Sequence, residues 1–200
     1  QAVDLLVAQP ACAHFISQEL ATYFVADDPP APLVDAMAQT FQHTHGDIRS
    51  VLRTLFDAPE FAASLGKKFK DPMHYLVSSV RLAYDGRAAP DSRRLVVWLN
   101  QQGEGEFAHQ TPDGYPLVAS AWDSSGQMSA RFELARAMGQ GDVRLFGGVA
   151  MPQMPQLSGA LFVQAIKPWL SSTTLAALDQ AKSPAEWNAY LLAAPESNYR

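Results

Sequence analysis

Cysteine is almost absent from this sequence, in which Cys12 is the only one among 200 residues. A single cysteine cannot form a disulfide within the chain, and it cannot build a metal cluster that needs several thiolates. Long apolar runs are also missing, since none approaches the roughly 18 residues that span a bilayer. These absences exclude a disulfide scaffold, and we expect neither a transmembrane segment nor a cofactor.

An excess of positive charge is missing as well. The 15 lysines and arginines are outnumbered by 20 aspartates and glutamates, which gives a formal net charge of −5. A nucleic-acid-binding surface needs clustered basic residues, so no nucleic acid partner is expected. The one basic run, Lys67-Lys68-Phe69-Lys70, is short, and we interpret it as a solvated connector.

Familiar catalytic motifs are not found either. The sequence has no nucleophile elbow, no phosphate-binding loop and no H-E-x-x-H pair. Ser64 and Lys67 have the S-x-x-K spacing of serine acyl-enzymes, but neither S-D-N nor K-T-G accompanies them. Because four-residue matches arise often by chance, we interpret this one as a coincidence.

The sequence does contain strong helical periodicity. A hydrophobic fraction of 48% and a charged fraction of 18% are typical of a packed globular protein. Apolar residues of the stretch 48–56 recur at intervals of three and four, with Asp47 placed to cap the first turn. Similar patterns recur along residues 1–200, so we predict a single all-α domain. Its expected architecture is an orthogonal bundle of about eight to ten helices.

For three of the predicted helices, the sequence also predicts whether particular side chains are buried or exposed. The helix from Pro10 to about Val25 should bury an apolar stripe that includes Phe15. The helix from Asp71 to about Tyr84 should leave His74 at the surface. A later helix, capped by Ser129, should turn three charged residues toward solvent, namely Arg131, Glu133 and Arg136.

One stretch, 103–128, has no helical period and is predicted to be a long irregular loop. It contains four glycines and two prolines, and connections of this length are uncommon in compact domains unless they have a function. Its candidate catalytic residues are His109, as acid or base, and Asp113, as orienting group or ligand. Tyr115 and Trp122 are candidate binding residues. The structural alternative is that both aromatic residues only clamp the loop onto the helices.

A second group of polar residues suggests metal binding. His43, His45 and Asp47 fall within five residues, and imidazole and carboxylate are common metal ligands. The alternative, which we favour, is a polar turn between helices, in which Gly46 takes a positive φ and Asp47 caps the next helix. No further strong ligand lies close in the sequence.

Several sequence blocks also point to a known family. They are Phe15-Ile16-Ser17, the stretch 23–30, Gly46-Asp47-Ile48-Arg49, Leu55-Phe56, the stretch 58–61, Asp113-Gly114-Tyr115-Pro116, Trp122 and Ala194-Pro195-Glu196. In this order, over nearly the whole chain, they resemble the C-terminal half of the bacterial domain-of-unknown-function family 1800. The family usually has a small or acidic pair where this sequence has His43 and His45, which weakens the metal hypothesis.

The resemblance implies a location and a partner but no reaction. Members of this family are longer and generally predicted to be exported, and their genes often lie beside those of another exported family of unknown function. A periplasmic or secreted protein is therefore implied, with an exported protein partner and an N-terminal half beyond this sequence. The start at Gln1 rather than at Met agrees with that expectation.

Two functional hypotheses follow. The first is a non-catalytic, exported helical domain with a structural or protein-interaction role in an envelope-associated assembly. The second is a hydrolase that acts on envelope material or an extracellular polymer, with its site in the 103–128 loop. The first is motivated by the missing motifs, and the second by His109 and Asp113.

Overall fold

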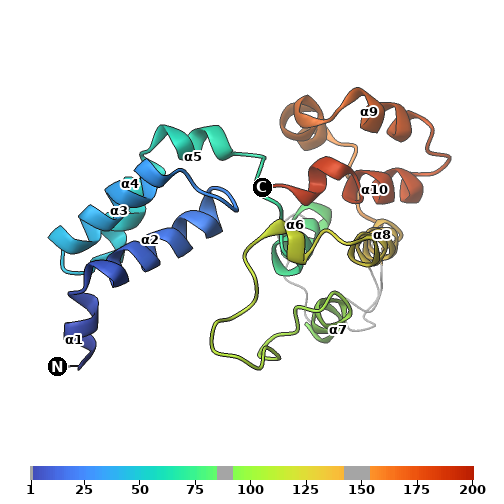
Figure 1. Ribbon diagram of the computed structural model, residues 1–200. Coiled ribbons are helices and arrows are strands. Elements are labelled where there is room, and N and C mark those ends of the chain that lie inside the picture. Colours follow the sequence, from blue (N-terminus) through green and yellow to red (C-terminus); the bar gives the residue numbers. More distant parts are fainter. Residues whose placement is uncertain (1, 85–91, 142–153) are drawn as a thin grey trace. The chain divides into compact units, whose positions relative to one another are not determined.

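The computed structural model describes residues 2–84, 92–141 and 154–200 (Figure 1). Within these ranges the regular elements are helices, and the only β-type pairing is an isolated antiparallel bridge between Phe69 and Tyr199. The predicted all-α fold is confirmed. The chain divides into two compact units. Unit 1 comprises Gln1–Lys68, Leu117–Ala119 and Arg200, and unit 2 comprises Phe69–Pro116 and Ser120–Tyr199. The single domain stays a prediction.

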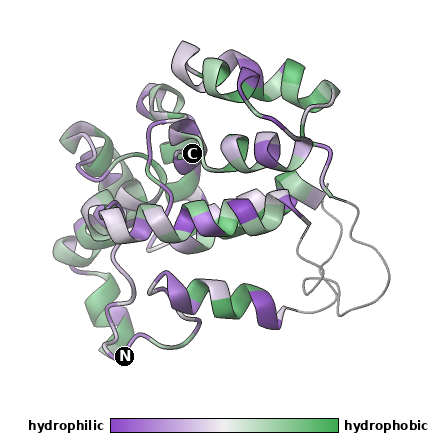
Figure 2. Ribbon diagram, turned by 90° about the vertical axis from the view of Figure 1, so that its right-hand side faces the viewer, coloured by the Kyte–Doolittle hydropathy of each residue, from purple (hydrophilic) through white to green (hydrophobic). Residues whose placement is uncertain are grey.

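The described part of unit 1 is built from five α-helices. They are α1 (Ala2–Val7), α2 (Pro10–Phe24), α3 (Ala31–His43), α4 (Ile48–Phe56) and α5 (Pro59–Ser64). Their shared core contains Ala13, Ala21, Val25, Leu33, Val34, Met37, Phe41, Val51 and Leu55. Helices of both units carry polar and apolar residues along the same segment, as amphipathic helices do (Figure 2).

Helix α4 forms as its sequence predicts. Val51 and Leu55 are fully buried on its apolar side. The Asp47 carboxylate accepts hydrogen bonds from Arg49 N at 3.3 Å and Ser50 N at 3.2 Å. These amides have no partner within the helix, so the side chain of Asp47 provides the cap.

Helix α2 buries the predicted stripe only in part: Ile16, Leu20 and Phe24 are half-buried against the core of unit 1, but Phe15 is not. Phe15 is 61% exposed, whereas the buried positions are occupied by small residues, Ala13, Ser17, Ala21 and Thr22. Helices α2 and α3 pack along their lengths, and small side chains at four-residue intervals allow their axes to approach closely. A phenylalanine stripe at this contact would hold the two helices apart, so the prediction for Phe15 was wrong.

The described part of unit 2 contains another five α-helices and several short helical turns. The α-helices are α6 (Pro72–Tyr84), α7 (Arg93–Gln101), α8 (Ser125–Gly139), α9 (Ser172–Asp179) and α10 (Pro184–Leu192). The short turns are a π-helical turn, η3 (Phe162–Ile166), and the 3₁₀ turns η4 (Lys167–Trp169) and η5 (Pro195–Asn198).

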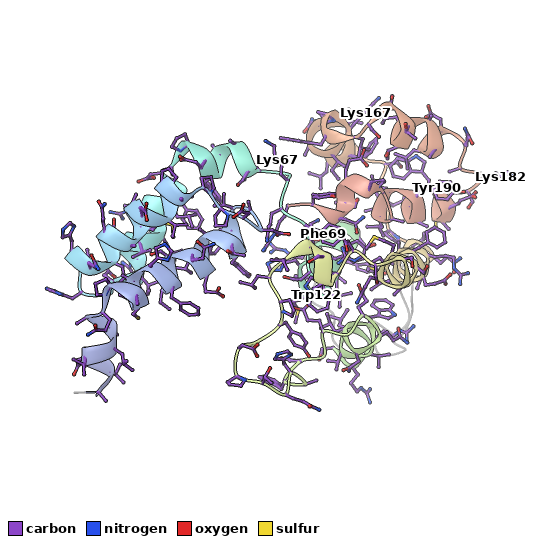
Figure 3. All side chains as sticks on the ribbon, in the orientation of Figure 1. Lys67, Phe69, Trp122, Lys167, Lys182 and Tyr190 are labelled. Atoms are coloured by element: carbon purple, nitrogen blue, oxygen red, sulfur yellow. The ribbon has the colours of Figure 1, made fainter. Side chains whose placement is uncertain are left out.

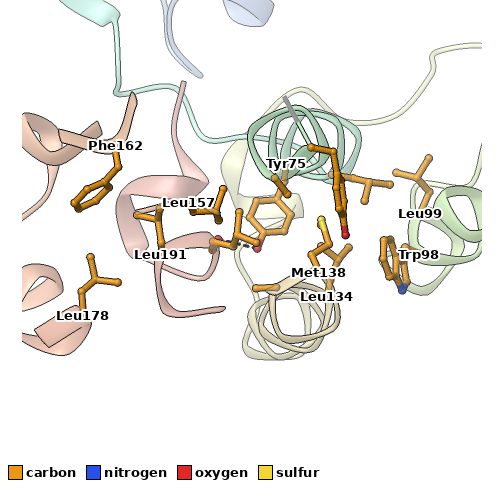
Figure 4. Packing of buried hydrophobic residues seen from close by; sticks show 14 residues of the cluster. Tyr75, Trp98, Leu99, Leu134, Met138, Leu157, Phe162, Leu178 and Leu191 are labelled. Atoms are coloured by element: carbon orange, nitrogen blue, oxygen red, sulfur yellow. Dashed lines mark hydrogen bonds between the residues drawn. The ribbon is translucent and has the colours of Figure 1, made fainter. Parts of the chain in front are cut away.

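The core of unit 2 is centred on Tyr75 of α6 (Figure 4). This side chain is fully buried with Leu134 and Met138 of α8 and Leu191 of α10. Its hydroxyl donates hydrogen bonds to the carbonyl of Leu192 at 3.0 Å and, at 3.3 Å, to that of Arg131. A buried hydroxyl without such a partner would be costly, so Tyr75 fixes α6 against both neighbouring helices.

The irregular stretch ends earlier than predicted, because α8 begins at Ser125 and not after Ser129. The hydroxyl of Ser124 accepts a hydrogen bond from Gln127 N at 3.3 Å and supplies the cap. Residues 103–124, here called the loop, are otherwise irregular apart from one 3₁₀ turn, η1 (Ala119–Ala121).

Candidate functional site

The predicted catalytic residues of the loop lie close together in unit 2. Nε2 of His109 is 3.3 Å from Oδ1 of Asp113 and 2.9 Å from the hydroxyl of Thr111. The Thr111 hydroxyl also donates a hydrogen bond to Asp113. The His109 ring packs on Tyr115, with ring centroids 4.7 Å apart. The loop therefore builds a histidine–carboxylate pair from residues that are neighbours in the sequence.

The pair lies beside an open pocket of about 510 Å³. The pocket is lined by Asn100, Gly103, Gly105, Ala108, His109, Gln110, Thr111 and Tyr115. The Asp113 side chain is 78% exposed. Hydrogen bonds from Thr111 and His109 lower its pKa, so it is a carboxylate at neutral pH. Because Thr111 and Asp113 both contact Nε2 of His109, acid–base catalysis by this ring would have to use Nδ1.

The two aromatic candidates make hydrogen bonds within the loop. The Tyr115 hydroxyl donates to the carbonyl of Gly105 at 2.7 Å, and the Trp122 indole N–H donates to that of Pro116 at 2.8 Å. Trp122 (labelled in Figure 3) is only 6% exposed and does not line the pocket, whereas Tyr115 does. Both hydrogen bonds join residues of the loop to each other, and Tyr115 is the aromatic candidate that a ligand in the pocket could reach.

Phe107 is the most unusual residue of the loop. Its side chain is 97% exposed and its φ is +56°. A positive φ is a genuine outlier for a bulky residue, and such strain costs of the order of 1–3 kcal/mol. The sequence shows only an aromatic residue in a polar, glycine-rich stretch, so its exposure could not be predicted.

A second polar cluster lies at the first turn of α6, where the sequence indicates Asp71 as the cap but gives no sign that Glu104 joins it. Oδ1 of Asp71 accepts a hydrogen bond from His74 N at 2.7 Å, and Oδ2 contacts Nδ1 of His74 at 2.7 Å. Oε2 of Glu104, at the start of the loop, accepts one from Met73 N at 2.7 Å. Two carboxylates therefore accept hydrogen bonds from backbone amides in the first turn of α6, where the helix dipole favours negative charge.

Glu104 has an unusual acidity for a carboxyl group. Burial raises its pKa to about 7, and the charge of Asp71 adds to this rise. The hydrogen bond from Met73 and the positive charges of His74 and Arg131 act in the opposite direction but do not compensate. Glu104 therefore changes its charge near neutral pH.

Arg131 is buried rather than solvated, so the prediction for this residue was wrong. It is 2% exposed, and its guanidinium lies between the rings of Phe69 and Tyr75, 4.7 Å and 4.8 Å from their centroids. Nη1 donates to Oδ1 of Asn198 at 2.9 Å, and Nη2 donates to the carbonyl of Lys70 at 2.7 Å. These contacts compensate part of the lost hydration of the cation, whose pKa burial still lowers.

The basic run is also partly buried, which corrects the interpretation of a solvated connector. In unit 1 Lys68 is 3% exposed, whereas Lys67 is exposed. The ammonium of Lys68 donates to Asp27 and, at 2.7 Å, to the carbonyl of Leu117. Oδ2 of Asp27 also accepts a hydrogen bond from Ala119 N at 2.7 Å. Burial acts to raise the pKa of Asp27, but the contacts with Lys68 and Ala119 outweigh it and lower this pKa.

The candidate metal residues form the predicted turn. His43 and His45 are exposed, Gly46 has a φ of +88°, and the Asp47 carboxylate caps α4. Across the described ranges, no three histidine, cysteine, aspartate or glutamate residues are grouped so that they could hold a metal ion. None of the helices described is both long enough and apolar enough to cross a membrane.

The comparisons with known proteins give one match. The model of a family described as "Protein of unknown function (DUF1800)" matches residues 1–199. Neither a curated protein nor a solved structure matches the chain. The family match covers nearly every residue, and it confirms the resemblance that the sequence blocks indicate. The chain therefore belongs to the DUF1800 family of proteins of unknown function.

Proposed function

We propose that this domain is a non-catalytic protein-interaction module of an envelope-associated assembly, and that its loop presents Phe107 to a protein partner. The envelope location is supported by the export that the family resemblance implies. The observation that carries the interaction role is the 97% exposure of Phe107 on backbone with a positive φ. Local strain of this kind occurs preferentially at functional positions.

The hydrogen bonds around Phe107 support this role. Ala108 N donates to the carbonyl of Gly105 at 3.1 Å and closes the turn that carries Phe107. The Tyr115 hydroxyl binds the same carbonyl, and Glu104 binds α6. These bonds hold the backbone of the turn that carries Phe107, so this part of the loop has less conformational entropy to lose when a partner binds.

Unit 1 offers further apolar surface. No residue of α1 is buried, and Val3, Leu5 and Leu6 are each more than 60% exposed. A six-residue helix is marginal in water without tertiary packing. Such side chains support a contact with protein more than they support catalysis.

The first prediction concerns Phe107→Gly. We expect binding to the partner to weaken by at least about tenfold, because exposed aromatic anchors are typical hot spots of interfaces. Stability should be unchanged or rise by up to about 1 kcal/mol, because glycine adopts a positive φ without strain. The matched control is Phe132→Ala, which truncates an exposed phenylalanine on α8.

The measurement starts from the full-length protein in its own cells. A photo-crosslinking amino acid is placed at position 107 or, as the control, at position 132, and mass spectrometry identifies the adducts. A second protein crosslinked specifically from 107 is expected, and its affinity for the purified variants is then measured. Adducts confined to the protein's own chain, or equal yields from both positions, would contradict the proposal.

The hydrolase remains a second candidate because of one contact, the 3.3 Å approach of His109 Nε2 to Asp113. In this alternative His109 is the acid or base, Asp113 orients its ring, and Tyr115 forms the apolar side of the pocket. We expect His109→Gln to abolish turnover, because glutamine cannot exchange the proton. Asp113→Asn should reduce turnover less severely.

The test uses the full-length protein and a panel of envelope and extracellular polymers, with released products quantified by mass spectrometry. Asp123→Asn is the control, since it removes another exposed carboxylate of the loop. If the His109→Gln variant hydrolysed a polymer as fast as the natural sequence does, the loop would not be the catalytic site.

A further inference from the structure

We propose that protonation of Glu104 controls the contact between its side chain and the start of α6. This contact, here called the tether, sets the position of the turn that carries Phe107. In its neutral form the carboxyl group stays bound to the start of α6, and in its charged form it is released toward water. The inference extends the proposed role of Phe107, but proton binding by Glu104 can be measured without any partner.

The geometry places Glu104 at the base of the turn that carries Phe107. Its backbone N–H donates to the carbonyl of Leu99 at 3.1 Å, which joins it to the end of α7. Its side chain binds Met73 N of α6 at 2.7 Å. The next residue, Gly105, receives the hydrogen bonds of Ala108 and Tyr115. A movement of residue 104 therefore changes the position of the turn that contains Phe107.

Burial is the main reason why the ionised form of this carboxyl group is unfavourable, and the charge of Asp71 adds to it. His74, Arg131 and the hydrogen bond from Met73 N oppose it only in part. The carboxyl group faces Asp71, which immediately precedes α6 and repels a second negative charge, and His74 of α6, whose ring is bound to Asp71. From α8 it faces Arg131, whose hydrogen bonds at 2.7 Å and 2.9 Å go to other oxygens. The half-buried site also withholds part of the water that would solvate a carboxylate.

Protonation removes the charge without removing the tether. A solvent proton binds one carboxyl oxygen, and the other oxygen still accepts the hydrogen bond from Met73 N. The pKa of the bound Glu104 carboxyl group is about 7, above the ordinary value of 4.5. Between pH 4.5 and about 7 the bound carboxyl group is protonated, whereas a released, solvated Glu104 is ionised. Release therefore frees a proton in this range, and the tether weakens as the pH rises. Below pH 4.5 both forms are protonated and the pH has no further effect.

The test is hydrogen exchange of the full-length protein between pH 5.5 and 8.5, with exchange rates corrected for their intrinsic pH dependence. The readout is the protection of the Met73 amide and of the turn 105–108. In the natural sequence we expect protection to fall by at least about tenfold over this range, the factor that corresponds to one pKa unit. In Glu104→Gln, which keeps an acceptor oxygen but has no charge, protection should stay constant.

Glu106→Gln is the control, because it removes the charge of an exposed residue two positions away, and it should reproduce the pH profile of the natural sequence. Equal pH profiles for the natural sequence and Glu104→Gln would overturn the proposal. If protection depends on pH but position 107 yields no adduct with a second protein, the tether stands and the interaction role of Phe107 falls.

Discussion

Arg131→Met is expected to lower the free energy of unfolding of unit 2 by about 2–5 kcal/mol. The substitution withdraws the donors bound to Oδ1 of Asn198 and to the carbonyl of Lys70. Each buried acceptor left without a partner costs roughly 1–3 kcal/mol. It also removes the cation from between Phe69 and Tyr75. The desolvation cost of the buried guanidinium, which methionine does not have, offsets only part of this loss.

Tryptophan fluorescence during urea unfolding of the 200-residue chain measures this effect, because its four tryptophans all belong to unit 2. Arg136→Met on the same helix is the control. Its side chain is 53% exposed and paired with Glu133, so we expect a change within about 0.5 kcal/mol. Arg131→Lys should also destabilise, because an ammonium cannot reproduce the planar fork of donors. An Arg131→Met variant as stable as the control would show that the buried cation is dispensable.

Gly139→Ala should also destabilise unit 2, by about 1–3 kcal/mol or more, although alanine is the better helix former. A Cβ at this position would lie 2.8 Å from Ala189 N and 2.9 Å from the carbonyl oxygen of Ala185. Both atoms belong to the backbone of α10, which cannot move away as a flexible side chain can. The added methyl group therefore forces α8 and α10 apart and loosens the contacts between them.

Gly126→Ala provides the matched control within the same helix. The nearest atom to a Cβ there is the hydroxyl of Ser124 at 4.0 Å, so the methyl group has space. This variant should gain up to about 1 kcal/mol from helix propensity. Opposite signs for the two glycines, measured by the same fluorescence transition, are the expected result. Stabilisation by Gly139→Ala would mean that α8 and α10 are not in close contact.

The helices and the loop could be predicted because their signals are local. Asp47 caps α4 through amides two and three residues away, and apolar spacing identifies the buried face of that helix. The clustering of His109, Thr111, Asp113 and Tyr115 is similarly local, since all four lie within seven residues. Contacts over such short separations depend mainly on turn geometry, which glycine and proline indicate.

The charged residues could not be placed in the same way. Arg131 and Lys68 are the type of residue that is normally exposed, and the periodicity around Arg131 did not distinguish it from Arg136. Their burial depends on oxygen atoms and rings that are distant in the sequence, such as Asn198 for Arg131 and Leu117 for Lys68. Glu104 and Met73 are 31 residues apart in the sequence. The environment that raises the pKa of Glu104 therefore cannot be inferred from its neighbours along the chain.

The sequence by itself determined the all-α class, the family, the cap at Asp47 and the irregular stretch that carries Phe107. The class, the cap and the irregular stretch follow from residue type and short-range spacing, whereas the family follows from the resemblance of ordered blocks along the chain. Only the tertiary structure decided that Arg131 and Lys68 are buried, that small residues form the contact face of α2, and that Gly139 meets the backbone of α10. The physical reason is that burial and close approach depend on which distant segments fill the neighbouring space, whereas helix formation depends mainly on neighbours along the chain.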